Sequence, residues 1–535
     1  MRIKLRTLLA LISPVLLAVA AAYIQWGTLG LPALPALHHM TPQTASQPYG
    51  FPAWIRITHL INFFLIILLI RSGLQILMDH PRLYWNVHCT PGSEWLRLTP
   101  VKVPRDRVWT SKDDARNLSP WIGLPGGRHT VGMARHWHFL SVLFWVVNGV
   151  VFVVLLFGTR QWERLVPTSW HIVPAAWAVF VHYATFHLPP EPDGFYSYNA
   201  LQQLSYFGVV FILPPLAMLA GLAMSPALTN RFKRYPKLPG NRQIGRSLHF
   251  FVMCAFVAFI IAHVTMVVIS GFARNMNHIV MGTDNTNPIG LIIGLIAIAV
   301  VVALNVAANW AAHKHPRKVQ HAAKAIVTPI MSLLLDRAGP VAQFRREDIS
   351  PYFWPNGKMP VSDEWKSLAA DGFKDYRLKI YGLVQNPVEL SLRDIAALEK
   401  KTQITLHHCI QGWSGIAAWS GIPLAQLIAM VVPAPEVKHV VFYSYGEGWH
   451  GGQYYDSLSM RDALHPNTTL AYEMNGKALT DLHGAPLRLR VENQLGFKMV
   501  KWIQAIEFVE NIESIKQGEG GYSEDREYFG ELANI

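Results

Sequence analysis

Six long apolar runs constrain the fold of this chain more than any other feature of its sequence. The first follows the basic start of the chain and ends near Tyr23, and the others cover residues 54–78, 137–158, 200–225, 247–272 and 288–311. Each is close to the about 20 residues that an α-helix needs to cross the hydrocarbon core of a bilayer. We therefore expect a multi-pass bundle of about six spans, with the first run retained as an anchor.

The composition indicates that this bundle makes up only part of the protein. Hydrophobic residues are 51% of the 535 positions and charged residues only 15%, which is a small share for a soluble protein. The apolar runs end before residue 313, whereas residues 340–535 read as ordinary soluble sequence. The net charge is +13, but the Lys and Arg residues gather between the apolar runs, so it does not indicate a nucleic-acid partner. Three cysteines are too few for a disulfide framework.

The basic loops predict which side of the membrane each part occupies. With six spans and the N-terminus inside, loops 79–135 and 226–246 fall on the cytoplasmic side of a bacterial-type inner membrane, as the positive-inside rule expects. Residues 313–535 then lie in the cytoplasm as well. A shorter run over 168–188 is interpreted as an interfacial helix. If it also spanned, the second half of the chain would face outward, against the charge bias.

Histidines inside the apolar runs predict metal sites in the membrane. His249 and His263 are fourteen residues apart, so at about 100° and 1.5 Å per residue they share one helix face about 21 Å apart. His59 begins the second run, and His136 and His138 begin the third at the opposite side. His59 can therefore meet His263, and one of His136 and His138 can meet His249. Intramembrane histidines are functional by default, which favours two stacked bis-histidine haem sites over simple helix–helix hydrogen bonds.

This half of the chain resembles the dihaem b-type cytochrome subunit of formate dehydrogenases and hydrogenases. The matching pieces are Arg56-Ile-Thr-His59, Arg71-Ser-Gly73, Tyr198-Asn-Ala-Leu-Gln-Gln-Leu and Leu248-His249 with His263, within about residues 50–285. The resemblance implies two haem b groups, the same histidine pairings and a quinone or quinol partner.

A cysteine in the second half is the strongest candidate for catalysis. Cys409 follows a predicted strand over 403–406 and begins the run Cys-Ile-Gln-Gly-Trp-Ser, which is followed by Trp419-Ser-Gly-Ile-Pro-Leu. A lone cysteine is more often a small buried hydrophobic residue. This run, however, resembles the cysteine loop of the sulfite-oxidase-fold molybdenum enzymes, especially the branch of the methionine-sulfoxide reductase catalytic subunit. The resemblance implies that Cys409 supplies a thiolate to a molybdenum held by molybdopterin, a metal that suits soft ligands.

The same resemblance extends over about residues 340–535 and implies the residues that hold the cofactor. It includes Asn356-Gly357, the alternating segment from Tyr376, Leu470-Ala-Tyr-Glu-Met-Asn-Gly and the segment from Gly496 to Trp502. The implied cofactor-binding residues are Asn356, His408, Cys409, His483, Arg488, Lys498 and Lys501. One departure is that Gln411-Gly-Trp-Ser stands where relatives with anionic substrates carry arginines, which disfavours an oxyanion substrate.

Together these features predict four segments and one electron path. The segments are an N-terminal anchor and outer loop over 1–50, a dihaem cytochrome over 51–312, a basic tether over 313–345 and an α+β molybdopterin domain over 346–535. We expect electrons to pass between the quinone pool, two b haems and molybdenum, reducing an S-oxide or N-oxide. The alternatives are a dehydrogenase that oxidises a small sulfur compound or other donor, and a non-enzymatic electron carrier. A further redox partner fits any of these functions.

Overall fold

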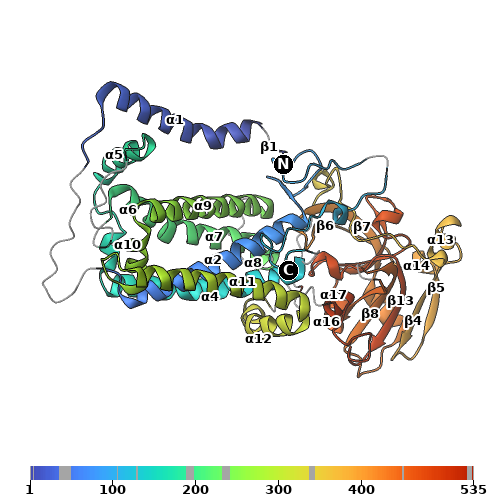
Figure 1. Cartoon of the computed structure of the whole chain (residues 1–535). Coiled ribbons are helices and arrows are strands. Elements are labelled where there is room, and N and C mark those ends of the chain that lie inside the picture. The colour runs from blue at the N-terminus through green and yellow to red at the C-terminus, as the bar shows by residue number, and fades with distance from the viewer. Residues whose placement is uncertain are drawn as a thin grey trace.

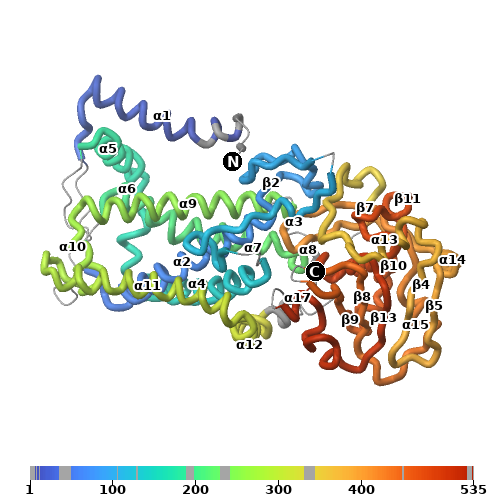
Figure 2. The backbone as a smooth tube through the Cα atoms, turned by 45° about the vertical axis from the view of Figure 1, so that its right-hand side comes forward, coloured from blue at the N-terminus to red at the C-terminus, as the bar shows by residue number. Residues whose placement is uncertain are grey.

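The protein consists of a helical bundle followed by a sheet-rich domain, as the sequence predicts (Figure 1). The computed structural model describes residues 2–3, 5–34, 50–104, 107–127, 131–187, 195, 198–231, 241–335, 344–448, 451–526 and 533. The tube in Figure 2 shows the same two parts from another side, with the sheet domain at one end of the long helices.

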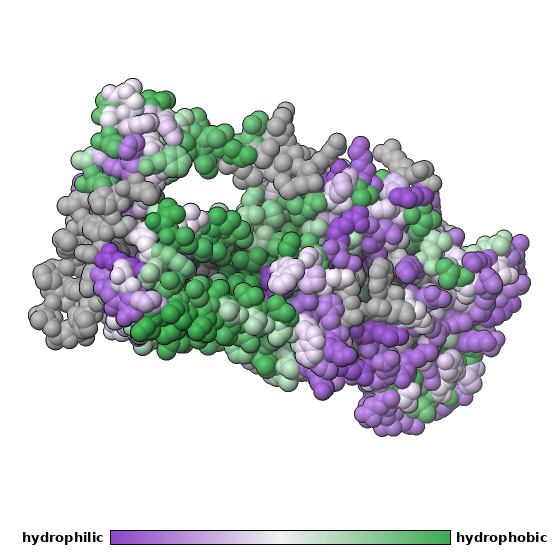
Figure 3. Space-filling view, in the orientation of Figure 1, coloured by the Kyte–Doolittle hydropathy of each residue, from purple (hydrophilic) through white to green (hydrophobic). Residues whose placement is uncertain are grey.

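Within the described residues, six helical segments are long and apolar enough to cross a membrane. They are Ile12–Leu29 within α1 Leu5–Leu29, α2 Ala53–Asp79, α4 Val131–Gly158, the continuous segment Ala200–Ala223, α9 Arg242–Ile269 and α11 Pro288–Lys314. The continuous segment comprises α6 Ala200–Phe207, the π-helical turn Gly208–Ile212 and α7 Leu213–Ala223. Apolar side chains cover the outside of the bundle, which is green in Figure 3, whereas the sheet domain is mostly polar. The prediction of a multi-pass membrane protein is confirmed.

The helix α5, Ile172–Ala184, lies within the run that we expect not to span the membrane. It has 13 residues, so at about 1.5 Å per residue it is about 20 Å long, shorter than the hydrocarbon core. It packs beside α1, where Trp177 Nε1 donates to Gln25 Oε1 at 2.8 Å. Figure 1 shows α5 between α1 and α6, and it packs against both helices.

Short strands and helices lie between the long helices of the bundle. At the end that meets the sheet domain, the segment between α2 and α4 holds β2 Arg82–Leu83, β3 Leu96–Arg97 and the short helix α3 Ser111–Asp114. The other short elements of the membrane half are β1 Arg2–Ile3, η1 Gln161–Arg164, α8 Pro226–Arg231, α10 Phe272–Met276 and η4 Asn277–Met281.

The predicted basic tether contains a helix, α12 Pro316–Leu335, that packs against α4. It also reaches the sheet domain, because Arg317 Nη2 donates to Gln517 Oε1 at 2.9 Å. His321 Nε2 lies 3.3 Å from a carboxylate oxygen of Glu519. These contacts hold the connection against both halves.

The sheet domain contains two five-stranded sheets, with strand orders β11-β10-β7-β6, where β12 also pairs with β10, and β5-β4-β13-β8-β9. β4 and β13 are parallel, and the other pairs within these sheets are antiparallel. Its elements are η5 Arg346–Asp348, α13 Asp363–Ala370, β4 Arg377–Gly382, β5 Val388–Ser391, α14 Leu392–Ala396, β6 Lys401–His408, β7 Ser414–Pro423, α15 Leu424–Val431, β8 His439–Glu447, β9 Gln453–Ser459, α16 Met460–Ala463, β10 Thr468–Met474, β11 Lys477–Ala478, η6 Asp481–His483, β12 Arg488–Val491, η7 Gly496–Lys498, β13 Ile503–Val509 and α17 Tyr522–Asp525.

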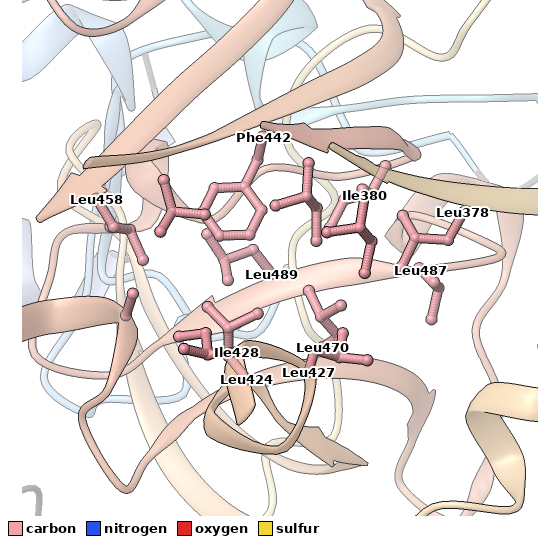
Figure 4. Close-up of a cluster of buried hydrophobic side chains, with 14 of the residues drawn as sticks. Leu378, Ile380, Leu424, Leu427, Ile428, Phe442, Leu458, Leu470, Leu487 and Leu489 are labelled. Carbon is pink, nitrogen blue, oxygen red and sulfur yellow. The ribbon is translucent and has the colours of Figure 1, made fainter. Parts of the chain in front are cut away.

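Alternating side chains build the main core of this domain. In β4, Leu378 and Ile380 are buried while Arg377 and Lys379 are exposed, the period of two that marks a half-buried strand. Leucines and isoleucines of both sheets and of α15 converge with Phe442 in one apolar cluster (Figure 4). Burial of such side chains contributes about 25 cal/mol per Å² of apolar surface. This core fixes the sheets that carry the Cys409 loop.

A second apolar cluster lies where the two halves meet. It joins Tyr84 and Cys89, from the segment after α2, to Trp354, Cys409 and Trp413 of the sheet domain. All five side chains are at most 1% exposed. The cysteine loop is therefore packed against the membrane half rather than open to solvent.

Candidate functional site

The cysteine loop is a tight turn between two paired strands. β6 and β7 form an antiparallel hairpin in which His408 pairs with Ser414. The Cys409 N–H donates to Trp413 O at 3.1 Å, and the Gly412 N–H donates to Cys409 O at 3.1 Å. Gly412 has φ +108°, a conformation that glycine adopts without the penalty of a Cβ atom. The loop backbone thus holds the Cys409 thiol in one orientation.

Two polar side chains contact the thiol of Cys409 within the second apolar cluster. Cys409 is 0% exposed, Asn356 Nδ2 donates to its sulfur at 3.6 Å, and its thiol lies 3.8 Å from Gln411 Oε1. Burial raises the pKa of Cys409 to about 12, so the free thiol stays protonated. A soft metal ion bound to the sulfur would displace that proton outright. A protonated thiol is a poor nucleophile, so the chemistry of this position is compatible with the metal ligand that the resemblance implies.

A cavity lies in front of Asn356 and Gln411, and its lining is strongly cationic. Among the described residues, its charged lining groups comprise the cations Lys112, Lys358, Arg488 and Lys501, with the carboxylate of Glu447. Burial is the main cause that lowers the pKa of Lys112, of Lys501 and of Arg488, and repulsion from nearby cations adds to it. Several cations buried together are costly unless an anion joins them, so this cavity suits a phosphate group.

Arg488 and His483 show how the cavity is prepared for an anion. Arg488 Nη1 donates to His483 O at 2.9 Å, and its guanidinium lies over the Trp419 ring at 4.6 Å. Arg488 Nε is buried and has no hydrogen-bond partner among the described residues. His483 also lines the cavity, and its Nε2 lies 3.2 Å from Phe353 O. These groups fit the pterin phosphate that the resemblance implies.

The structure brings four of the residues implied for cofactor binding to this cavity. They are Asn356, His483, Arg488 and Lys501. Lys501 Nζ donates to Asn356 O and, at 2.9 Å, to Leu482 O, which links the two segments that flank the cavity. Cys409 lies directly behind the lining.

His408 differs from the prediction. Its neighbour His407 lines the cavity, while His408 faces the membrane half with its Nδ1 3.5 Å from Arg242 Nη1. Successive side chains of a strand point to opposite faces, so only one of two adjacent histidines in β6 can reach the cavity. The cavity is therefore lined by His407 and not by the predicted His408.

Lys498 also departs from the prediction. Its Nζ donates to a carboxylate oxygen of Asp456 at 2.8 Å and to one of Glu524 at 3.0 Å. These carboxylates hold the pKa of Lys498 well above its usual range even though burial opposes this. Its charge is balanced within the protein and is not available to a phosphate. The residue instead fastens α17 to β9.

Sequence reasoning missed Lys112, because this lysine belongs to the membrane half. It lies on α3, where Ser111 Oγ donates to Gln411 Oε1 at 2.6 Å. Thr110 and Asp113 form a capping box that starts this helix. The Thr-x-x-Asp pattern marks a helix start but says nothing of which distant segment the helix meets.

In the membrane half, His138 and His249 face one another with ring centres 6.3 Å apart. A metal–imidazole bond is about 2 Å long and the nitrogen lies about 1 Å from the ring centre, so two imidazoles on opposite sides of one iron have centres about 6 Å apart. Ser72 Oγ donates to Leu68 O at 2.7 Å, so it accepts from His138 Nδ1 at 3.1 Å. His249 Nδ1 donates to Ala217 O at 3.1 Å. Both Nε2 atoms are thereby left free to bind a metal.

A second pair lies toward the other end of the bundle. His59 and His263 have ring centres 6.4 Å apart. His263 stacks on Phe259 at 5.5 Å and meets the edge of Tyr206 at 6.0 Å. The structure therefore brings the rings of His59 and His263 close together.

The structure also separates His136 from His138. His136 Nδ1 bonds to Gly132 O at 2.9 Å in its own helix, whereas His138 faces His249. Two residues apart on a helix, their side chains point about 200° apart. A Cβ added at Gly73 would lie 3.5 Å from His138 Cε1, and one at Gly221 would lie 3.6 Å from His249 Cε1. Small residues thus flank the two imidazoles of the inner pair.

Comparison with known families agrees with this fold of a helical membrane half followed by a sheet domain. The family described as prokaryotic cytochrome b561 matches residues 50–282, and the oxidoreductase molybdopterin binding domain matches residues 365–515. The chain is a fusion of a membrane cytochrome b with a molybdopterin-binding oxidoreductase domain, as predicted. Molybdenum–molybdopterin and haem b are the cofactors that these matches support.

The chain is similar to particular proteins of methionine-sulfoxide reduction. A protein of Azospira oryzae, provisionally named a protein-methionine-sulfoxide reductase subunit, is 36% identical over 31% of this chain and 58% of that protein. The methionine-sulfoxide reductase catalytic subunit of Xanthomonas campestris is 30% identical over 31% of this chain and 56% of that protein. The chain spans little more than half the length of these relatives. The sulfane dehydrogenase SoxCD structure from Paracoccus pantotrophus aligns at 26% identity over 26% of this chain and 39% of that chain, with a TM-score of 0.24.

Proposed function

We propose that this protein is a membrane-bound enzyme that takes electrons from quinol and reduces an S-oxide at a molybdenum–pterin centre. The observation that carries this proposal is the Cys409 loop, which lies beside a buried cationic cavity and packs against the cytochrome half. Reduction of a sulfoxide consumes two electrons and two protons and releases a sulfide and water. Oxidation of one quinol supplies both electrons and releases two protons.

The protein's own residues would hold and orient the cofactor. Arg488, Lys501 and His483 would bind the pterin phosphate, and Asn356 would position the Cys409 sulfur through the 3.6 Å contact. The bound molybdenum centre supplies the oxygen-atom transfer chemistry. The closed packing around Cys409 keeps water away from its sulfur.

Lys112 would contact the oxygen atom of the substrate. It lines the cavity, interacts electrostatically with Cys409, and is held on α3 by the Ser111–Gln411 bond of 2.6 Å. Gln411 is neutral where relatives with anionic substrates carry arginine, and a single lysine suits the partial negative charge of an S–O or N–O group.

The histidine pairs would hold two haem b groups, one toward each end of the bundle. Support comes from the ring-centre distances of 6.3 Å and 6.4 Å and from the hydrogen bonds of the inner pair. Quinol would reduce the outer haem at His59 and His263. The inner haem at His138 and His249 would then pass electrons to molybdenum, because His249 lies near the start of α9, whose first residues bond to the cysteine loop.

The sheet domain would face the cytoplasm. It joins the bundle at the end where the basic residues Arg82, Arg116, Arg242 and Arg246 lie, and cytoplasmic loops carry the excess of Lys and Arg. A reporter fused after residue 535 that is active only in the cytoplasm should be active. Activity of a reporter that works only outside the membrane would contradict this orientation.

The direction of electron flow is tested anaerobically with purified protein. The haems are reduced by dithionite, excess reductant is removed, and methionine sulfoxide, dimethyl sulfoxide or trimethylamine N-oxide is added. An oxide substrate should restore the oxidised haem spectrum. If no oxide does so while a reduced sulfur compound reduces the oxidised haems, the protein is instead the dehydrogenase that the sequence leaves open.

A further inference from the structure

The first turn of the helix that carries His249 rests directly on the cysteine loop. Gln243 Nε2 donates to Gly412 O at 2.9 Å and to Ser414 Oγ at 3.0 Å. Arg242 Nη1 donates to Cys409 O at 3.4 Å. We call this set of contacts the α9 junction.

The α9 junction is buried and fixed from both sides. Gln243 is 0% exposed, and the Asn241 side chain accepts from the Gln243 and Ile244 N–H groups, which pins the first turn of α9. On the other side, Ser414 Oγ donates to Val87 O at 2.7 Å. The contact is therefore part of the packed interior and not an encounter between mobile surfaces.

The junction connects the two redox sites by a short and continuous route. His249 is seven residues after Arg242 on the same helix, which is about 10 Å along the helix axis. At the other end of the route, Arg242 and Gln243 bond to the backbone on both sides of the Cys409 loop. Other contacts between the halves also reach this loop, such as Ser111 Oγ with Gln411 Oε1 at 2.6 Å, but Ser111 lies on α3 and not on the helix that carries His249.

We infer that the α9 junction is the path by which electrons pass from the inner haem to the molybdenum centre, within one chain and without separation of the two halves. Gln243 is the positioning residue of this path: its amide holds Gly412 and Ser414 in register with the helix that carries His249. Each reduced haem gives up one electron, so two transfers deliver the pair that an oxide consumes. This inference rests on the proposed function for the identity of the cofactors.

The test follows the molybdenum centre directly and needs no substrate. Oxidised protein is mixed with quinol, haem reduction is followed by absorbance, and freeze-quenched samples are followed by the paramagnetic molybdenum signal. The variant is Gln243→Leu, which removes both hydrogen bonds while keeping a helix-compatible side chain of similar size. Gln426→Leu is the matched control, because Gln426 is a helical glutamine of α15 whose Nε2 donates to Glu399 O at 3.0 Å, away from the junction.

In Gln243→Leu, haem reduction by quinol should match the wild-type rate, while the molybdenum signal should rise about tenfold more slowly. Haem and molybdenum contents should equal those of Gln426→Leu, and reduction of an oxide by excess reduced viologen should be unchanged. A second variant, Gln243→Glu, should show the same slowing, because its carboxylate cannot donate to Gly412 O.

Three results would overturn the inference. The first is a molybdenum signal that rises in Gln243→Leu and Gln243→Glu as fast as in the control. The second is an equal fall in viologen-driven turnover, which would make the junction part of the molybdenum site alone. The third is loss of haem, which would make it a structural support of the bundle. Failure of the wild type to reduce any oxide would contradict the proposed function but leave this measurement intact.

Discussion

The two histidine pairs have nearly the same spacing but different surroundings. In the inner pair, Ser72 and Ala217 accept hydrogen bonds from the Nδ1 atoms of His138 and His249, and the helix of His249 begins on the cysteine loop. In the outer pair, His263 lies among the aromatic rings of Phe259 and Tyr206. A hydrogen bond at Nδ1 fixes the ring and makes the ligand more basic, so two similar sites can differ in potential. The comparison teaches that equal ring spacing does not make the two pairs equivalent, because only the helix of His249 begins at the cysteine loop.

The largest effect is expected from a variant that changes the sheet domain and leaves both histidine pairs intact. Cys409→Ser replaces a soft sulfur donor with a hard oxygen, so oxide turnover should fall by more than about a hundredfold. Both haems should still load and be reduced by quinol, because their ligands lie in the other half. The measurements are turnover, metal content and the haem spectrum. A variant with full molybdenum content and wild-type turnover would make Cys409 a packing residue only.

Loss of one haem is the next effect, and it tests whether the two pairs are separate sites. His138→Ala should remove the inner haem and His263→Ala the outer one, each leaving about one haem per chain. Both variants should lose quinol-driven turnover. His136→Ala is the matched control and should keep both haems, because His136 bonds within its own helix. The pyridine haemochrome assay measures the haem content of each variant and of the wild type. A wild-type protein with a single haem would reject one of the pairs.

A smaller effect tests whether the membrane half contributes to substrate binding. Lys112→Met removes the ammonium group but keeps the length of the side chain. Because a hydrogen bond to a charged group contributes about 1.5–3 kcal/mol, KM for the oxide should rise by about tenfold or more. Molybdenum content and haem reduction should stay the same. Lys400→Met, at an exposed lysine of the same protein, is the control. An unchanged KM would exclude Lys112 from the substrate site.

The smallest effect concerns the stability of the sheet domain in acid. Burial lowers the pKa of His483 to about 4, below its usual value of 6.5. Between these values the unfolded state binds more protons, so this contribution to the free energy of unfolding is complete above pH 6.5 and is lost as pH falls toward 4. His483→Gln should therefore lose less Tm than the wild type between pH 7 and pH 5. His321→Gln, at a histidine with 56% of its side chain exposed, is the control. Identical Tm losses in all three proteins would contradict this assignment.

Four of the predicted cofactor-binding residues line the cavity, whereas His408 and Lys498 do not. The strand before Cys409 and the Asn356, His483, Arg488 and Lys501 positions could be predicted because local motifs carry them. His407 lines the cavity in place of the predicted His408, because a motif does not state which face of the strand meets the cavity. Lys498 is paired with the buried carboxylates of Asp456 and Glu524, which come from distant segments of the chain.

The sequence by itself determined the six apolar runs, the cysteine loop and the fourteen-residue spacing of His249 and His263. The runs and the spacing follow from periodicity and length, which act locally along the chain, whereas the cysteine loop is identified by its resemblance to a known family. Only the tertiary structure decided that His138 rather than His136 faces His249, and that Lys112 and Gln243 reach the Cys409 loop. Such meetings depend on how helices rotate and pack against a distant domain, and no local pattern encodes that rotation.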